Sequence, residues 1–158
     1  MSSGDTLSAI TAPQIFDGTQ LLRDHCVLIS EAHIMGVSPI ADCPSNAELI
    51  TLPEGTLAPG FIDLQVNGGG DVMFNTSPSR AALDTIARAH RRKGTTSLLP
   101  TVLSEAAHVH KDAVQAVQDA RRNNLAGILG LHIEGPFFAP QKRGVHAANQ
   151  VRAPMPAD

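Results

Sequence analysis

The chain has 158 residues, of which 42% are hydrophobic and 17% charged, and this composition is typical of a globular protein that buries a core. The net charge of -3 leaves no excess of Lys and Arg for nucleic acid or an anionic membrane, so we expect neither as a partner. No stretch approaches the ~20 apolar residues of a membrane-spanning helix, the start lacks a signal peptide, and the two cysteines are interpreted as reduced thiols, so we expect a cytoplasmic protein.

Residues 1–53 predict a small β domain. Short β-rich segments alternate there with turns, and the Asp17-Gly18 pair is a strong turn signal. The predicted strands are Gln14–Phe16, Cys26–Ser30 and Glu48–Leu52.

From residue 54 the pattern changes to apolar strands that alternate with longer helical segments, which is typical of parallel βα units. The first unit begins with a strand at Phe61–Val66, and a glycine-rich loop follows at residues 67–70. Ser77-Pro78 predicts a capped helix start, and the helix ends in cations followed by Gly94. The apolar helix face is formed by Leu83, Ile86, Ala87 and His90.

The second unit repeats this plan. Thr95–Leu99 is a predicted strand, residues 100–104 form its loop, and a helix follows at about Glu105–Asn123. The apolar helix face is formed by Val109, Ala113, Val117 and Ala120. Ile128–Glu134 is the third predicted strand.

Polar side chains stand at the carboxyl ends of these strands, where parallel α/β folds assemble their active sites. We therefore expect Gln65, Asn67, Thr101 and Glu134 to point toward a common face. A closed (β/α)8 barrel takes ~250 residues. Residues 54–158 suffice for about three of its eight units, so the chain is either part of a larger enzyme or a small open sheet, and we favour the former.

Glu134 is the sharpest functional feature, because a carboxylate at the end of a buried strand must be paired, hydrogen-bonded or bound to a metal. One interpretation is a metal ligand or a general acid or base. The other is a salt bridge to Lys142 or Arg143 in the next loop, and physical reasoning favours neither.

Two histidines lie near this carboxylate. His132 precedes Glu134 by two residues, so both side chains would share one strand face, although a packed core histidine is the more common case. His146 lies in the basic loop beyond, where it is either a substrate contact or part of a solvated surface loop.

Two further patterns carry less weight. His108 and His110 form an HxH pair, but on a helix positions two apart cannot share one ion, and we interpret both as surface residues. The run Gly68-Gly69-Gly70 lacks the partners of a phosphate-binding loop and indicates a tight turn.

Three segments taken together resemble the N-acetylglucosamine-6-phosphate deacetylase family of the amidohydrolase superfamily. They are LAPGFIDLQVNGGGDVMFN (57–75), GTTSLLPT (94–101) and GLHIEGPFFAPQKRGVHAANQVRAP (130–154). The resemblance implies a partial (β/α)8 TIM-like barrel of the metal-dependent hydrolase type at residues 54–158, truncated, preceded at residues 1–53 by half of a small β-sandwich domain.

The resemblance also implies the site. The superfamily carries HxH on its first barrel strand, and this chain, like the deacetylases, has Gln65 and Asn67 there, which are poor zinc ligands. We therefore expect one divalent metal ion, zinc or alternatively iron, with Glu134 as a ligand. Val145, through its backbone, and His146 map to substrate contacts. The family's catalytic Asp lies beyond Asp158, so no catalytic residue is expected in this chain.

The function that the resemblance implies is metal-dependent hydrolysis of N-acetylglucosamine 6-phosphate to glucosamine 6-phosphate and acetate. We expect the full-length enzyme to be a homo-oligomer and this chain alone to be inactive. The alternatives are a non-catalytic sugar-phosphate-binding or regulatory module, and another amidohydrolase that acts on a cyclic amide.

Overall fold

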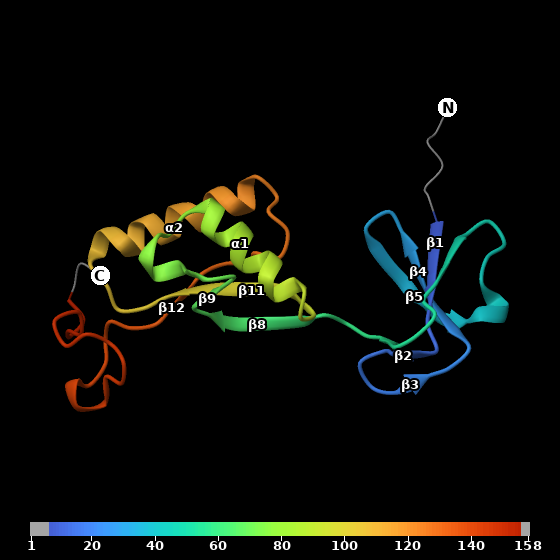
Figure 1. Cartoon of the computed structure of the whole chain (residues 1–158), viewed down its shortest axis with the longest axis horizontal. Helices are drawn as coiled ribbons and strands as arrows, with labels where there is room; N and C mark the ends of the chain where they lie inside the picture. Colours follow the sequence, from blue (N-terminus) through green and yellow to red (C-terminus); the bar gives the residue numbers. More distant parts are fainter. Residues whose placement is uncertain (1–6, 156–158) are drawn as a thin grey trace. The chain divides into compact units, whose positions relative to one another are not determined.

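In the computed structural model, which describes residues 7–155, the polypeptide forms two compact units that divide between Pro59 and Gly60 (Figure 1). The boundary expected from the sequence lies between residues 53 and 54. The linking segment, including the short strand at Thr56–Leu57, therefore belongs to the N-terminal unit.

The N-terminal unit consists of strands and short connections. Its main sheet has the order β5-β4-β1-β6, in which β1 pairs antiparallel with β4 and parallel with β6. A second small sheet has the order β3-β2-β7. The elements are β1 Leu7–Thr11, β2 Gln14–Phe16, β3 Leu21–Leu22, β4 His25–Ser30, β5 His33–Pro39, the 3-10 helix η1 Ile40–Asp42, β6 Glu48–Thr51 and β7 Thr56–Leu57. Strands β1, β3, β5 and β7 were not predicted, whereas β2, β4 and β6 match the predicted segments within one residue.

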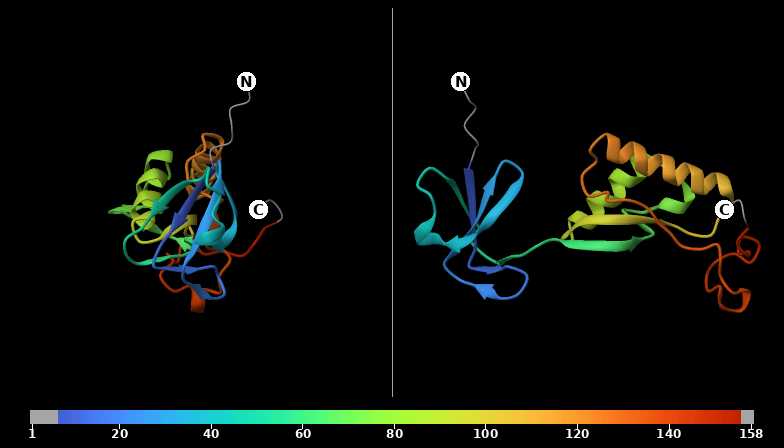
Figure 2. Two further views of the ribbon diagram at one scale, coloured as in Figure 1. Left: turned by 90° about the vertical axis from the view of Figure 1, so that its right-hand side faces the viewer. Right: turned by 180° about the vertical axis from the view of Figure 1, so that it is seen from behind.

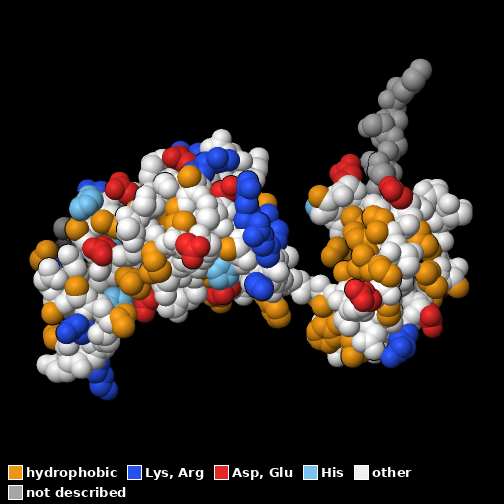
Figure 3. Space-filling model, in the orientation of Figure 1, with side chains coloured by type: hydrophobic (Ala, Val, Ile, Leu, Met, Phe, Trp, Pro, Cys, Tyr) orange, Lys and Arg blue, Asp and Glu red, His pale blue; other side chains and the backbone are white. Residues whose placement is uncertain are grey.

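Few side chains of the N-terminal unit are fully buried. Ala9 and Cys26 have no exposed surface and Ile15 is nearly buried. Large hydrophobic side chains remain exposed, among them Leu21, Ile34, Met35 and Leu49. Figure 3 shows hydrophobic side chains gathered on the side of this unit that faces the viewer. Both cysteines are free thiols, and burial together with the neighbouring Cys26 thiol raises the pKa of Cys43.

The predicted turn at Asp17-Gly18 is present and is built around the Asp17 carboxylate. Its Oδ1 accepts hydrogen bonds from the backbone N–H groups of Thr19 and Gln20 and from the Thr19 hydroxyl, at 2.8 to 2.9 Å. Gly18 supplies the positive φ of 106° that the turn requires. The backbone hydrogen bonds from Gln20 and Thr19 lower the pKa of Asp17 to about 2.

The C-terminal unit is built on a parallel sheet with the order β12-β11-β8. Strand β8, Phe61–Val66, has the predicted bounds. Strand β11, Thr95–Val102, extends three residues beyond the predicted end at Leu99. A two-stranded hairpin, β9 Gly68–Gly69 and β10 Val72–Met73, follows β8.

The third predicted strand, Ile128–Glu134, is wrong in its extent, because only β12, His132–Ile133, has regular strand geometry. The segment still runs beside β11: Ile128 forms an isolated bridge with Leu98, and the Glu134 N–H donates to the Val102 carbonyl at 2.9 Å. Gly130, a residue type that weakens strand geometry, lies between these contacts.

Both long helices cover one side of this sheet, as Figures 1 and 2 show. They are α1, Arg80–Arg91, and α2, Ala107–Arg122, and shorter 3-10 helices lie at η2, Phe74–Thr76, and η3, Pro140–Lys142. The core between helices and sheet includes Val66, Phe74, Leu83, Ile86, Leu98, Val102, Ala113, Val117 and Ala120. The predicted apolar faces of both helices are therefore confirmed. Among residues 7–155, no helix is both long enough and apolar enough to cross a membrane.

The predicted start of the first helix is wrong by two residues. Ser79, in extended conformation, is the N-cap, and its Oγ accepts a hydrogen bond from the Ala82 N–H at 3.2 Å. Ser77 instead terminates η2. Both serines precede apolar helical residues, so the sequence pattern alone cannot separate them.

Replacing Ser79 with Ala should lower the free energy of unfolding by about 0.5–2 kcal/mol, because one N–H of the first helical turn loses its acceptor. Urea denaturation of the purified chain measures the change. Ser77→Ala is the matched control and should change stability by less than about 0.5 kcal/mol. Equal losses in the two variants would contradict the assignment of the cap.

The Asp17 turn predicts an acid-sensitive contribution to stability. Because the folded-state pKa is depressed, the contribution is present above the ordinary aspartate value of 3.8 and is lost as the pH falls toward about 2. Carbon-13 titration of the Asp17 carboxyl should give a midpoint near the lower value. Thr19→Ala removes the hydroxyl donor and should move that midpoint upward. A wild-type midpoint near 3.8 would refute the assignment.

Candidate active site

Glu134 lies directly after β12, at the carboxyl end of the parallel sheet. Its Oε2 accepts a hydrogen bond from Gln65 Nε2 at 2.9 Å, and its Oε1 lies 3.5 Å from His146 Nε2. The Glu134 side chain keeps 28% of its surface exposed. The carboxylate is thus held by two neutral or weakly basic partners and remains reachable from solvent.

Gln65 reaches this carboxylate from the carboxyl end of β8. Its backbone N–H donates to Asp63 Oδ1 at 3.1 Å. The parallel pairing of β8 and β12 with β11 brings the strand ends together although Gln65 and Glu134 are 69 residues apart in sequence. Two of the four strand-end residues expected on a common face are therefore in direct contact.

The alternative of a salt bridge from the basic loop to Glu134 is not what the structure contains. The Arg143 guanidinium donates to the backbone carbonyl oxygen of His146. Within residues 7–155, the ion pairs recorded are Arg88–Asp84, Arg122–Asp119 and His146–Glu134, so no Lys or Arg neutralises this carboxylate.

His146 is buried, with 5% of its surface exposed, which excludes the interpretation as a solvated surface residue. Its ring packs on Phe138 with centroids 4.4 Å apart, and its Nδ1 accepts a hydrogen bond from the Ser104 N–H at 3.3 Å. The neighbouring Val145 is 88% exposed. The loop therefore leaves Val145 exposed and places His146 Nε2 3.5 Å from Glu134 Oε1.

The other strand-end polar residues have different surroundings. Thr101 is fully buried, and its Oγ1 lies 3.1 Å from Nδ1 of the half-buried His132. This contact supports the packed, hydrogen-bonded interpretation of His132. Asn67 is exposed, and its backbone carbonyl accepts a hydrogen bond from the Phe74 N–H at 2.9 Å.

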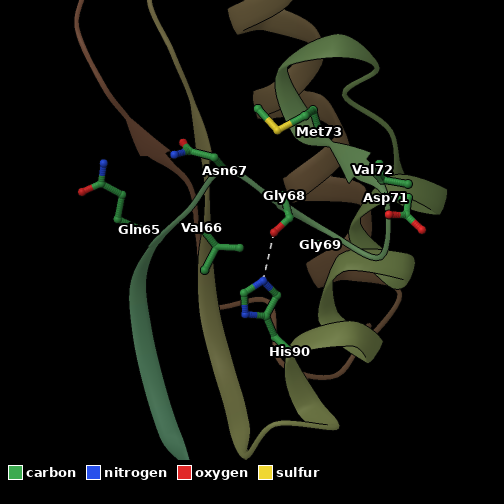
Figure 4. A pocket seen from close by; sticks show the side chains of 9 residues that line it. All are labelled: Gln65, Val66, Asn67, Gly68, Gly69, Asp71, Val72, Met73 and His90. Carbon is green, nitrogen blue, oxygen red and sulfur yellow. Dashed lines mark hydrogen bonds between the residues drawn. The ribbon is translucent and has the colours of Figure 1, made fainter. Parts of the chain in front are cut away.

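A pocket of about 620 Å³ lies at the glycine hairpin (Figure 4). His90 of α1 reaches the hairpin there, with Nε2 2.9 Å from the Gly68 carbonyl oxygen. Gln65 and Asn67 also line this pocket, whereas Glu134 and His146 do not. The glycine run thus forms a tight turn, as predicted. The contact of His90 with this turn was not predicted, because the sequence analysis placed His90 only on the apolar face of the helix.

The HxH pair divides into two roles. His108 is exposed, in agreement with the sequence analysis. His110 is half-buried, and its Nε2 lies 2.8 Å from the Leu103 carbonyl oxygen, so its interpretation as a surface residue was wrong. The helix turns His110 back onto the loop after β11, a contact that no local sequence pattern reports.

The residues near Glu134 do not form a complete metal site by themselves. Residues 7–155 contain no group of three or more His, Cys, Asp or Glu side chains that could hold a metal ion. Glu134 can contribute carboxylate oxygens, whereas the amide of Gln65 is a poor ligand for zinc. The donor set in this part of the chain therefore supplies one metal ligand and needs others.

Comparison with known proteins identifies relatives named as deacetylases of acetylated hexosamine phosphates. An N-acetylgalactosamine-6-phosphate deacetylase of Shewanella sp. (strain ANA-3) is 38% identical over 146 residues, which cover 87% of this chain and 37% of that protein. The N-acetylglucosamine-6-phosphate deacetylase of Haemophilus influenzae is 36% identical over 142 residues, covering 90% of this chain and 37% of that protein. No protein-family model matches the chain.

Solved structures give the same result. The N-acetylglucosamine-6-phosphate deacetylase from Pasteurella multocida matches with a TM-score of 0.89 and 34% identity, covering 96% of this chain and 40% of that chain. The resemblance inferred from the three sequence segments is therefore confirmed. This chain spans well under half the length of these relatives.

Gly135 permits the tight turn that follows Glu134. Its φ is 91°, and a Cβ at this position would overlap Ser104 Oγ and approach a Phe138 ring carbon to 2.7 Å. Gly135→Ala should therefore lower the free energy of unfolding by about 1–3 kcal/mol, measured by urea denaturation.

Gly144→Ala is the matched control for this variant, since Gly144 also has a positive φ, of 58°, but open space around its Cα. It should lose about 1 kcal/mol or less. Equal losses in the two variants would show that the contacts with Ser104 and Phe138 do not restrict position 135.

Proposed function

We propose that this chain is part of a hydrolase that removes the N-acetyl group from an N-acetylhexosamine 6-phosphate. Water is added across the amide, the carbon–nitrogen bond breaks, and the products are acetate and the amino-sugar phosphate. The observation that carries the proposal is the convergence of Gln65, Glu134 and His146, which come from separate segments of a chain similar to such deacetylases.

We assign N-acetylglucosamine 6-phosphate as the substrate, in agreement with the relative from Haemophilus influenzae and with the solved structures. The relative from Shewanella acts, by its name, on the galactosamine isomer, so hydrolysis of both sugar phosphates must be compared. The two differ in the orientation of one hydroxyl, and a site that hydrogen-bonds this group can distinguish them.

The roles of Glu134, Val145 and His146 are those that the resemblance to the deacetylases implies. Glu134 supplies one ligand to a divalent metal ion, for which zinc is our assignment. Val145 contacts the substrate through its backbone, and His146 contacts it through its ring. Gln65 orients the Glu134 carboxylate by its amide N–H. The remaining metal ligands and the group that transfers the proton come from outside residues 7–155.

The architecture that accompanies this function is a TIM-like barrel of the amidohydrolase type. Residues 54–158 would form its first βα units and residues 1–53 half of a small β-sandwich domain. The sheet order β12-β11-β8 supports the barrel, since strands that follow one another in the chain are neighbours, as in (β/α)8 folds. We further propose a cytoplasmic homo-oligomer as the full-length enzyme.

A non-catalytic sugar-phosphate-binding module is the second candidate, and the incomplete metal donor set among residues 7–155 favours it for the chain in isolation. Calorimetric titration of the purified chain with N-acetylglucosamine 6-phosphate distinguishes the two. Micromolar binding without acetate release supports the module, whereas the absence of binding supports an inactive part of the enzyme that needs ligands from outside residues 7–155.

In the active full-length protein, Glu134→Gln should reduce the rate of acetate release at least about 100-fold and lower the bound metal per chain, because the ligand loses its charge. Released acetate and the metal content by atomic emission are the two measurements. Glu48→Gln, an exposed position on β6, is the control and should leave both unchanged. Full activity and full metal content in Glu134→Gln would refute the role of this carboxylate.

A further inference from the structure

The loop that follows β11, residues 103–105, is held at both of its ends by one side chain. Asn75, in η2, accepts a hydrogen bond from the Leu103 N–H through Oδ1 at 2.7 Å. Its Nδ2 donates to Glu105 Oε1 at 2.8 Å. Asn75 follows Phe74, which is fully buried, so the residue that holds the loop is itself anchored in the core.

A second side chain holds the same loop from α2. His110 Nε2 lies 2.8 Å from the Leu103 carbonyl oxygen. A carbonyl can only accept a hydrogen bond, so this nitrogen carries the proton. Both backbone polar groups of Leu103 are thereby bonded to side chains, one from η2 and one from α2.

The middle residue of the loop contacts the backbone of Glu134 and the ring of His146. The Ser104 hydroxyl donates to the Glu134 carbonyl oxygen at 3.4 Å, and the Ser104 N–H donates to His146 Nδ1 at 3.3 Å. Ser104 is 4% exposed, so water does not replace these bonds easily. A backbone N–H can only donate, and therefore His146 Nδ1 must be unprotonated.

We infer that Asn75 and His110 are positioning residues that, through the 103–105 loop, hold His146 in the tautomer with its proton on Nε2. That proton faces Glu134, whose Oε1 lies 3.5 Å from Nε2. The ring thus presents a hydrogen-bond donor where the site meets its substrate. The effect on catalysis rests on the proposed function, whereas the hydrogen-bond geometry does not.

The other tautomer is disfavoured on both sides of the ring. With the proton on Nδ1, two N–H groups would face each other at Ser104, and the bare Nε2 would face the Glu134 carboxylate. Releasing the loop removes the first of these conflicts. The loop therefore controls one of the two restraints on the His146 proton.

The test is nitrogen-15 NMR of the histidine rings in the purified protein at a fixed neutral pH. In the wild type, His146 should show an unprotonated Nδ1 and a protonated Nε2. In Asn75→Ala and in His110→Ala, the two ring shifts should move toward the average of a tautomer mixture. The Ser104 amide should exchange with solvent about tenfold faster, as expected for a lost buried hydrogen bond.

His108→Ala is the matched control, because His108 lies on the same helix but is exposed. In His108→Ala, the ring nitrogen shifts of His146 and the amide exchange rate of Ser104 should equal those of the wild type. The amide spectrum establishes that each variant is folded, and His110→Ala serves as the independent variant if Asn75→Ala does not fold. A protonated Nδ1 in the wild type, or wild-type shifts in every folded loop variant, would overturn the inference.

Activity is a separate readout in the full-length enzyme. The value of kcat/KM should fall about tenfold in both loop variants and stay unchanged in His108→Ala, as expected when a catalytic-site group loses its fixed orientation. The ring shifts need no substrate, so a wild type without deacetylase activity would refute the proposed function alone, while unchanged shifts would refute only the positioning role.

Discussion

The candidate site depends on how the partly buried carboxylate of Glu134, at the end of the edge strand β12, is hydrogen-bonded. Its partners are an amide from the first strand of the sheet and an imidazole from the following loop. Neither partner is a permanent cation, so the carboxylate is oriented without a Lys or Arg among residues 7–155 to compensate its charge. These surroundings are compatible with the metal-ligand role proposed for Glu134.

Much of the C-terminal unit could be predicted from local patterns, because apolar periodicity reports which side of an element is buried. The buried faces of α1 and α2 follow directly from it, whereas β8, predicted from its apolar run, leaves Phe61, Ile62 and Leu64 exposed. The expectation that strand ends meet also follows, since parallel strands align their carboxyl ends. The contact between Gln65 and Glu134 agrees with this expectation, because both residues lie at the carboxyl ends of strands in one parallel sheet.

The remaining features depend on contacts between distant segments, which no local pattern contains. Ser77 and Ser79 both precede apolar helical residues, and the structure uses Ser79 as the cap. His110 and Ser104 have ordinary sequence surroundings, yet His110 bonds to the 103–105 loop and Ser104 to His146. Strand β12 is short although the apolar composition of Ile128–Glu134 predicts a longer strand, and Gly130 lies in the part without regular strand geometry.

Val145 stands between two anchored points, the Arg143 guanidinium bonded to the His146 carbonyl and the buried His146 ring. Its backbone is fixed by these neighbours while its side chain extends almost wholly into solvent. A substitution of Val145 can therefore change the side chain while the backbone atoms at this position stay in place. The backbone contact proposed for Val145 would therefore not depend on which side chain stands at position 145.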